Sequence, residues 1–235
     1  MAMRYGNNLS NTIYGTSLAD VIYGYGGNDT IYAGSGNDRA YGDSGNDRLY
    51  MSYGNDRAYG GTGHDILYGQ SGYDVLYGGS GDDDIYGGNQ DDDLYGQSGY
   101  DFLDGGSGND YLDGGTHNDT VKGGTGNDTV KGGSGHDLVM GGSGNDLIIG
   151  GTGDDDLYGG SGFDVFVFDD YHGDDFIWDF QIGIDEIDLT LTNVTDIFVD
   201  SVFAGGTWST EIDYGTGWVT VIGVDPNQIA GDILI

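Results

Sequence analysis

The sequence predicts an all-β protein, a right-handed parallel β-roll followed by a C-terminal β-rich cap. Two observations lead to this prediction. A nine-residue pattern repeats eighteen times from Gly6 to Val167 without insertion or deletion, and its eighth position is apolar in every repeat. After residue 167 the Gly period fades, and all three Trp residues lie in this last segment. We therefore expect an N-terminal tail at residues 1–5, a roll at residues 6–167 and a cap at residues 168–235.

The composition narrows the classes of function. The chain of 235 residues carries forty acidic and six basic side chains, a formal net charge of -34, and 50 glycines. This acidity argues against nucleic acid and anionic membranes as partners and favours cations. No apolar stretch is long enough for membrane insertion, and the absence of Cys excludes disulfides and thiolate metal sites. Because the Gly is periodic, it indicates a repeat architecture rather than a disordered chain.

Each position of the repeat has a physical role. Positions seven to nine point outward, inward and outward as in a short strand, so one apolar side chain per repeat enters a core. The six residues before them are expected to form a turn, in which Gly permits positive φ and close backbone approach. Two repeats make one coil, and stacking of the coils aligns the turns along two edges of the roll.

Position six concentrates the negative charge. It is Asp in seventeen of the eighteen repeats, and Asn11 takes its place in the first. Stacked at about 4.8 Å, these carboxylates would form two ladders of repelling charges. A hard cation between successive turns, bound by carboxylate and carbonyl oxygens, removes that repulsion. Nine turns on each edge leave eight gaps, so the ceiling is roughly sixteen sites.

The pattern GGxGxDxUx resembles the calcium-binding nonapeptide of the RTX family. The resemblance covers residues 6–167. It implies a parallel β-roll that holds multiple Ca2+ ions between its turns, roughly 12–16 in this chain. It also implies ligands at the position-six carboxylates and at backbone carbonyls of turn glycines. The expected carboxylate ligands are Asp20, Asp29, Asp38, Asp47, Asp56, Asp65, Asp74, Asp83, Asp92, Asp101, Asp110, Asp119, Asp128, Asp137, Asp146, Asp155 and Asp164. The expected glycine ligands are Gly61, Gly63, Gly79, Gly81, Gly106, Gly108, Gly124, Gly126, Gly133, Gly135, Gly142, Gly144, Gly151 and Gly153.

Some turns depart from the pattern. Residues 7–9 and 16–19 look like a degenerate N-terminal cap. Gln90 and His117 replace the position-four Gly, and residues 51–53 replace the start of a further turn. We expect weaker or empty sites at these turns.

One layer of the predicted core is thin. Ala40 and Ala58 occupy position eight on neighbouring strands of one face. We expect the core to be under-filled there.

The segment after the roll carries a second resemblance. Residues 173–190, GDDFIWDFQIGIDEIDLT, resemble the segment that follows the roll in serralysin-type proteases and mannuronan C5-epimerases. One further ion at Asp174, Asp175, Asp179 and Asp185 is one interpretation, and solvated loop acids are the other. Residues 207–223 indicate two alternating strands around a Gly-Thr-Gly turn.

The two ends of the chain suggest a route of export. The N-terminus lacks the pattern of a secretory signal peptide. The C-terminus, an acid followed by three apolar residues from Asp232 to Ile235, resembles a type I secretion signal and is equally compatible with a final strand. We therefore expect the type I secretion apparatus as a partner. The protein would be extracellular or at the cell surface, free-standing or as the C-terminal module of a larger protein.

The outer faces give the second functional hypothesis. Position nine is Tyr in the first ten repeats, from Tyr14 to Tyr95, which predicts five stacked rings on each face. These rings are also a candidate platform for sugars. Arg39, Arg48 and Arg57 at position seven are interpreted as charges lying over the rings, with binding of an acidic polysaccharide as the alternative. The runner-up function is therefore a carbohydrate-binding or adhesive module.

The sequence shows no catalytic constellation, and we expect no enzymatic activity of this chain. The acid runs at residues 82–84, 91–93 and 154–156 imitate a glycosidase pair, but the repeat already accounts for the middle Asp of each. The four His residues lack the paired spacing of a zinc site.

Overall fold

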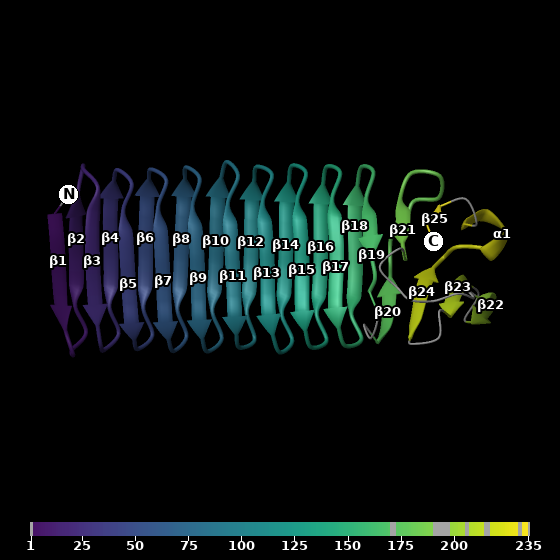
Figure 1. Cartoon of the computed structure of the whole chain (residues 1–235), viewed down its shortest axis with the longest axis horizontal. Helices are drawn as coiled ribbons and strands as arrows, with labels where there is room; N and C mark the ends of the chain where they lie inside the picture. The colour runs from purple at the N-terminus through teal and green to yellow at the C-terminus, as the bar shows by residue number, and fades with distance from the viewer. Residues whose placement is uncertain are drawn as a thin grey trace.

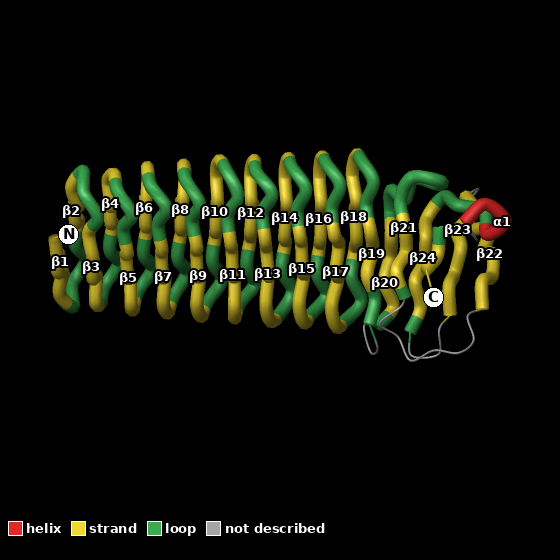
Figure 2. Tube along the Cα trace, turned by 45° about the horizontal axis from the view of Figure 1, so that its top comes forward, coloured by secondary structure: helices red, strands yellow, loops and turns green. Residues whose placement is uncertain are grey.

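Two facing sheets of stacked, mostly parallel strands form the protein (Figure 1). The computed structural model describes residues 2–169, 173–189, 198–204, 207–213, 217–229 and 232–234. Successive strands of the roll alternate between a 12-stranded and a 13-stranded sheet. The turns that join them line up along the two long edges (Figure 2). The predicted parallel β-roll is confirmed.

The described strands are as follows, in their spatial order. The 12-stranded sheet contains β1 (Ala2–Asn7), β3 (Asp20–Tyr25), β5 (Arg39–Ser44), β7 (Arg57–Thr62), β9 (Val75–Ser80), β11 (Asp93–Ser98), β13 (Tyr111–Thr116), β15 (Thr129–Ser134), β17 (Leu147–Thr152), β19 (Val165–Val167), β21 (Glu186–Asp188) and β25 (Ile233–Leu234). The 13-stranded sheet contains β2 (Thr12–Thr16), β4 (Thr30–Ser35), β6 (Arg48–Tyr53), β8 (Ile66–Ser71), β10 (Asp84–Asn89), β12 (Phe102–Ser107), β14 (Thr120–Thr125), β16 (Leu138–Ser143), β18 (Asp156–Ser161), β20 (Asp174–Ile177), β24 (Trp218–Ile222), β23 (Thr207–Asp213) and β22 (Phe198–Ala204).

The strands are longer than the sequence predicts. Most strands of the roll have six residues, because positions one to three stay in register with the next coil. Gly88 and Asn89, for example, pair with Gly106 and Ser107. The turn proper shrinks to positions four to six. The chain reverses there within three residues, which brings the position-six Asp close to the start of the next strand.

The N-terminal residues are not a tail. Residues 2–5, expected to lie outside the roll, begin β1, which pairs in parallel with β3. The backbone N–H of Ala2 donates a hydrogen bond to Asp20 Oδ1 at 2.9 Å. β1 thus pairs with the backbone N–H and C=O groups of β3 that would otherwise be exposed to solvent at the edge of the sheet.

Stacking continues past residue 167. β20 pairs with β18, and β21 pairs with β19, but the offset between partners grows from eighteen residues to twenty and twenty-one. The predicted hairpin is confirmed as antiparallel β23 and β24, and its turn at residues 214–216 lies outside the described residues. Ile233 and Leu234 form β25, whereas Ile235 is outside the described part. The short helix α1 (Pro226–Ile229) completes the cap, and no described helix is long and apolar enough to cross a membrane.

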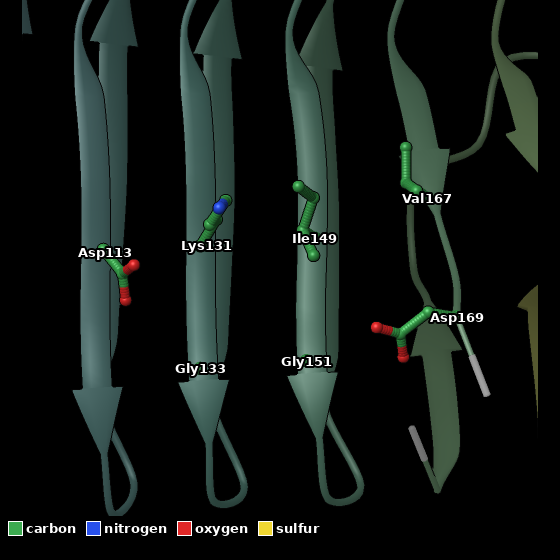
Figure 3. A pocket seen from close by; sticks show the side chains of 7 residues that line it. All are labelled: Asp113, Lys131, Gly133, Ile149, Gly151, Val167 and Asp169. Atoms are coloured by element: carbon green, nitrogen blue, oxygen red, sulfur yellow. The ribbon is translucent and has the colours of Figure 1, made fainter. Parts of the chain in front are cut away.

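The outer faces change character halfway along the roll. The two predicted ladders of five tyrosines are confirmed, with neighbouring rings parallel and their centroids 4.8–5.2 Å apart. Beyond them the 12-stranded sheet has a hollow of about 300 Å³ near Lys131 and Ile149 (Figure 3). Shorter position-nine side chains lie there beside Gly133 and Gly151, which have no side chain to fill the space.

Larger residues at position one accompany the two Ala residues at position eight. Positions one and eight of a repeat flank the same turn, and position one is usually Gly. Ala33 occupies position one of the repeat that contains Ala40, and Met51 that of the repeat that contains Ala58; all four are fully buried in one core cluster. From this coincidence we predict that Met51 fills the space that Ala58 leaves, against the under-filled layer expected from the two Ala residues alone.

This exchange makes a prediction about packing. Ala58→Leu alone adds volume to a filled layer and lowers the free energy of unfolding of the calcium-bound protein by about 1–3 kcal/mol. Met51→Gly combined with Ala58→Leu restores the common pairing of Gly with Leu and recovers most of that loss. Chemical unfolding of the three variants, with Met51→Gly as the third, measures the coupling. Stabilisation by Ala58→Leu in the presence of Met51 would show that the layer is under-filled after all.

Candidate metal centre

The position-six carboxylates form two ladders inside the edges of the roll. Each of these side chains is buried, with 0–3% of its surface exposed. One carboxylate oxygen, Oδ1, accepts a hydrogen bond from the backbone N–H of the position-six Asp one coil earlier. Asp38 Oδ1 accepts from Asp20 at 2.7 Å, and Asp164 Oδ1 accepts from Asp146 at 3.0 Å. Each Asp thus joins its own turn to the preceding turn on the same edge.

The second oxygen of almost every carboxylate has no hydrogen-bond partner. Burial of a polar atom without a partner is costly, and a buried anion costs more. The buried Oδ2 atoms without a partner belong to Asp29, Asp38, Asp47, Asp56, Asp65, Asp74, Asp83, Asp92, Asp101, Asp110, Asp119, Asp128, Asp137, Asp146, Asp155 and Asp164. Such a regular set of orphaned oxygens fits a ligand that recurs once per turn.

The environment disfavours the charged form of these groups. Burial raises the pKa of Asp83, Asp92 and Asp155 to about 8, with the neighbouring carboxylates of the same ladder as a further cause. Burial likewise raises the pKa of Asp137 and Asp146 to about 6. Without a cation, therefore, part of each ladder would hold protons near neutral pH.

Asp20 shows how protein groups alone can satisfy such a carboxylate. Its Oδ2 accepts hydrogen bonds from the backbone N–H of Thr16 at 2.6 Å and from Thr16 Oγ1 at 2.8 Å. Burial acts to raise the pKa of Asp20, but these bonds, the bond from Ala2 and the charge of Arg4 outweigh it and lower the pKa. At Asp20, two groups of Thr16 therefore take the place of an ion, whereas the Oδ2 atoms of the following carboxylates have no such partner.

Backbone carbonyls line the gaps between turns. All fourteen glycines expected as ligands have positive φ, from 97° at Gly106 to 146° at Gly135. A Cβ atom on Gly79 or Gly81 would collide with the carbonyl oxygen of Gly61 or Gly63 in the coil before. The glycines thus leave room for carbonyl oxygens between successive turns, and oxygen is the ligand atom that Ca2+ prefers.

The degenerate turns keep this backbone shape. Ser52, Gln90 and His117 have φ of 80°, 70° and 82°, values that side chains rarely adopt. The turn geometry is therefore imposed by the stack of coils even where Gly is absent. The expectation of weaker or empty sites at these turns stays a prediction.

A ladder at position five escaped the sequence analysis. The backbone N–H of Asn127 donates to Asn109 Oδ1 at 2.8 Å, and that of Asn145 donates to Asn127 Oδ1 at 2.8 Å. The backbone N–H groups of Phe163 and Tyr100 donate similar bonds, to Asn145 Oδ1 and Asp82 Oδ1 respectively. The recurrence of Asn before Asp in the repeat was the available signal. These bonds hold the turns at a fixed spacing beside the carboxylates.

The four acids of the cap do not surround one ion. Asp175 extends one ladder, because its Oδ1 accepts from Asp155 N–H at 2.9 Å. Asp185 extends the other, accepting from Asp164 N–H at 3.1 Å. Asp179 accepts from the N–H groups of Gly159 and Gly160, both at 2.9 Å. Because Asp155 and Asp164 belong to different ladders, Asp175 and Asp185 lie on opposite edges. The hypothesis of one shared ion is therefore corrected: the ladders continue into the cap.

The chemistry of the donor set points to a hard cation with backbone ligands. Within the described part of the chain, no cluster of three or more His, Cys, Asp or Glu side chains has metal-binding geometry. An ion between turns would therefore need carbonyl oxygens together with the carboxylates, an all-oxygen set typical of Ca2+.

Comparison with known proteins identifies the repeat. The model of the RTX calcium-binding nonapeptide repeat matches at residues 5–40, 41–76, 59–94, 74–103, 86–116, 95–130, 113–148 and 131–166. A search of curated protein sequences finds no significant match.

Two solved structures are similar in part. The R3 subunit of a mannuronan C5-epimerase from Azotobacter vinelandii is 25% identical, with a TM-score of 0.43, over 51% of this chain and 78% of that one. An extracellular lipase from Serratia marcescens is 17% identical, with a TM-score of 0.36, over 95% of this chain and 40% of the lipase. The chain thus spans well under half of the lipase. The repeats matched by the family model cover most of the roll, so the chain belongs to the family of RTX calcium-binding nonapeptide-repeat proteins and takes multiple Ca2+ ions as its cofactor.

Proposed function

We propose that this chain is a calcium-driven folding module, which orders outside the cell when Ca2+ enters the gaps between successive turns. The ligands in each gap are position-six carboxylates and the carbonyls of the turn glycines at positions two and four. Asp175 serves the last gap of its ladder. Asp179 and Asp185 each have both oxygens on backbone N–H groups and support turns rather than an ion.

The single observation that carries the proposal is the row of sixteen buried carboxylate oxygens without a partner, from Asp29 to Asp164. A stable fold leaves few such atoms, so a regular series of them calls for a regular ligand. The ligand must be positive, because the chain has a formal net charge of -34. Sixteen divalent ions, roughly the ceiling set by the gaps between turns, would nearly neutralise it.

The low calcium concentration of the cytosol favours export of the chain before it folds. Sites of the extracellular class have Kd of about 10⁻⁴–10⁻³ M and stay empty inside a cell. We propose the type I secretion apparatus as the partner that exports the unfolded chain. The acid and apolar residues from Asp232 onward support this route. The place of Ile233 and Leu234 in β25 is compatible with it, because on this proposal the strand forms only after export.

The second hypothesis, sugar binding by the Tyr ladders, receives less support. The rings lie within 3–10° of parallel and stack on one another, so their faces are already occupied. Only their edges remain free, which favours the structural role. The Arg interpretation also changes: the cation–ring contacts within residues 2–169 are those of Lys122 over Phe102 and Lys131 over Tyr111, not those of the arginines.

Protons and Ca2+ are expected to compete for the same carboxylates. A carboxyl whose pKa rises on folding favours the folded state below its unfolded pKa of about 3.9, and that stability is lost as pH rises through the folded pKa. Burial puts the folded pKa of Asp137 at about 6 and that of Asp83 at about 8. The ion-free roll is therefore least stable above pH 8 and gains stability on acidification.

This competition predicts two routes to the fold. In excess EGTA, far-UV circular dichroism should show coil at pH 8.5 and a gain of β-sheet at pH 5. Addition of Ca2+ at pH 8.5 should produce the same β-rich spectrum. A β-rich spectrum at pH 8.5 without any divalent ion would contradict the proposed role of calcium. A coil spectrum at pH 5 would show that protonation of the buried carboxylates does not stabilise the ion-free fold.

A charge-removing substitution tests the ligand assignment. Asp137→Asn keeps an oxygen to accept the N–H of Asp119, now at 2.7 Å, but removes the charge. Because Asp137 serves the gap before and the gap after it, two sites weaken. At ten times Kd each site contributes about 1.4 kcal/mol, so the loss is roughly 3 kcal/mol in the free energy of unfolding.

Asp20→Asn is the matched control. It makes the same chemical change at the same position of the repeat, but Thr16 already satisfies Asp20 Oδ2. We expect a clearly smaller loss of stability and of bound Ca2+, measured by calorimetric titration and chemical unfolding. Equal losses in the two variants would show that the ions do not bridge neighbouring turns.

A further inference from the structure

An aromatic surface lies on the outer side of the 13-stranded sheet, where the roll meets the cap. We call the exposed rings of Phe176, Trp178 and Trp218 the aromatic face. These side chains are 37%, 42% and 40% exposed. They point outward because their strand neighbours Asp175, Ile177 and Val219 point into the core. Large apolar side chains gathered on an open sheet surface indicate a binding surface.

The rings of the aromatic face are held in place but not covered. The indole N–H of Trp178 donates a hydrogen bond to Asp156 Oδ1 at 2.7 Å, which fixes the ring. Its neighbours Tyr158 and Phe176 have centroids 6.4 and 6.1 Å away. These distances exceed the 4.8–5.2 Å of the Tyr ladders, so the rings are offset and leave ring surface open. A fixed, open ring binds with little loss of side-chain entropy.

Carboxylates surround the aromatic face, and no basic side chain lies on these strands. Strand pairing places Asp156 beside Phe176 and Asp174 beside Trp218. The next strand adds Glu211 and Asp213, paired with Thr220 and Trp218. All six Lys and Arg residues of the chain lie between residues 4 and 131. An anionic ligand would therefore be repelled from this surface.

We propose that the aromatic face binds a neutral polysaccharide. The apolar C–H side of a pyranose ring stacks on an open aromatic ring, and carboxylates accept hydrogen bonds from sugar hydroxyls. The surface spans the neighbouring strands β18, β20 and β24, which suits an extended chain better than a compact small molecule. This function is separate from the calcium-driven folding proposed above, and requires only that the fold is present.

Affinity electrophoresis in 5 mM Ca2+, about ten times the Kd of sites of the extracellular class, tests this inference with the full chain. The gels contain hydroxyethylcellulose, mixed-linkage β-glucan, xyloglucan or alginate, the last as the anionic arm. We expect retardation by at least one neutral polymer and none by alginate. Trp218→Ala should weaken the binding about tenfold, as loss of a central aromatic contact does. The matched control is Tyr53→Ala, which removes an aromatic side chain that is 67% exposed at the end of β6, far from the aromatic face.

Two further measurements keep the test decisive. Circular dichroism in Ca2+ shows whether each variant folds, and the change in Trp fluorescence of the unaltered protein on addition of polymer reports binding without any substitution. Binding to no neutral polymer, equal binding to alginate, or a Trp218→Ala variant that binds as well as the unaltered protein would each overturn the inference. A dimer that Trp218→Ala dissociates would also overturn it, because the face would then join two copies of this chain.

Discussion

Burial of like charges at the spacing of one strand is the constraint on which the structure depends. Two ladders of carboxylates run inside the edges of the roll, and nearly every one has an oxygen without a partner. The apolar core, one side chain wide at position eight, offers little to offset this repulsion. In the function that we propose, ions from the surroundings offset this repulsion, and the stability of the fold depends on their concentration. Under that proposal, folding responds to the calcium of the extracellular medium.

The same constraint accounts for the glycines. A Cβ atom on Gly60 would meet both Asp65 Oδ2 and the carbonyl oxygen of Gly78, so position one must be small wherever the carboxylate and the next coil come close. The two larger residues at position one, Ala33 and Met51, occur in the two repeats whose position eight is Ala, and all of these residues are buried. Glycines at positions two and four supply the positive φ that turns the chain within three residues. Charge, backbone shape and core volume are thus tied together in each repeat.

Much of this arrangement could be predicted from the sequence because it repeats. A period of nine fixes the register of Asp, Gly and the apolar residue, and the register fixes the sheets, the edges and the ladders. The alternating pattern of residues 207–213 and 218–222 likewise predicted the antiparallel pair. What escaped prediction depends on contacts between coils: the pairing of Ala2 with Asp20 and the Asn bonds at position five. The prediction that the four cap acids hold one ion was wrong for the same reason. These acids are close in the sequence, but β20 and β21 belong to different sheets.

The central claim is that calcium lies between successive turns on both edges, held by the position-six carboxylates. Anomalous diffraction from crystals grown in Ca2+ tests this most directly, because it locates the ions without any substitution. The account predicts one peak in each gap between neighbouring carboxylates, for example between Asp119 and Asp137 and between Asp128 and Asp146, and continuing to Asp175. Peaks confined to exposed acids such as Asp82 or Asp154, with the ladder gaps empty, would contradict it.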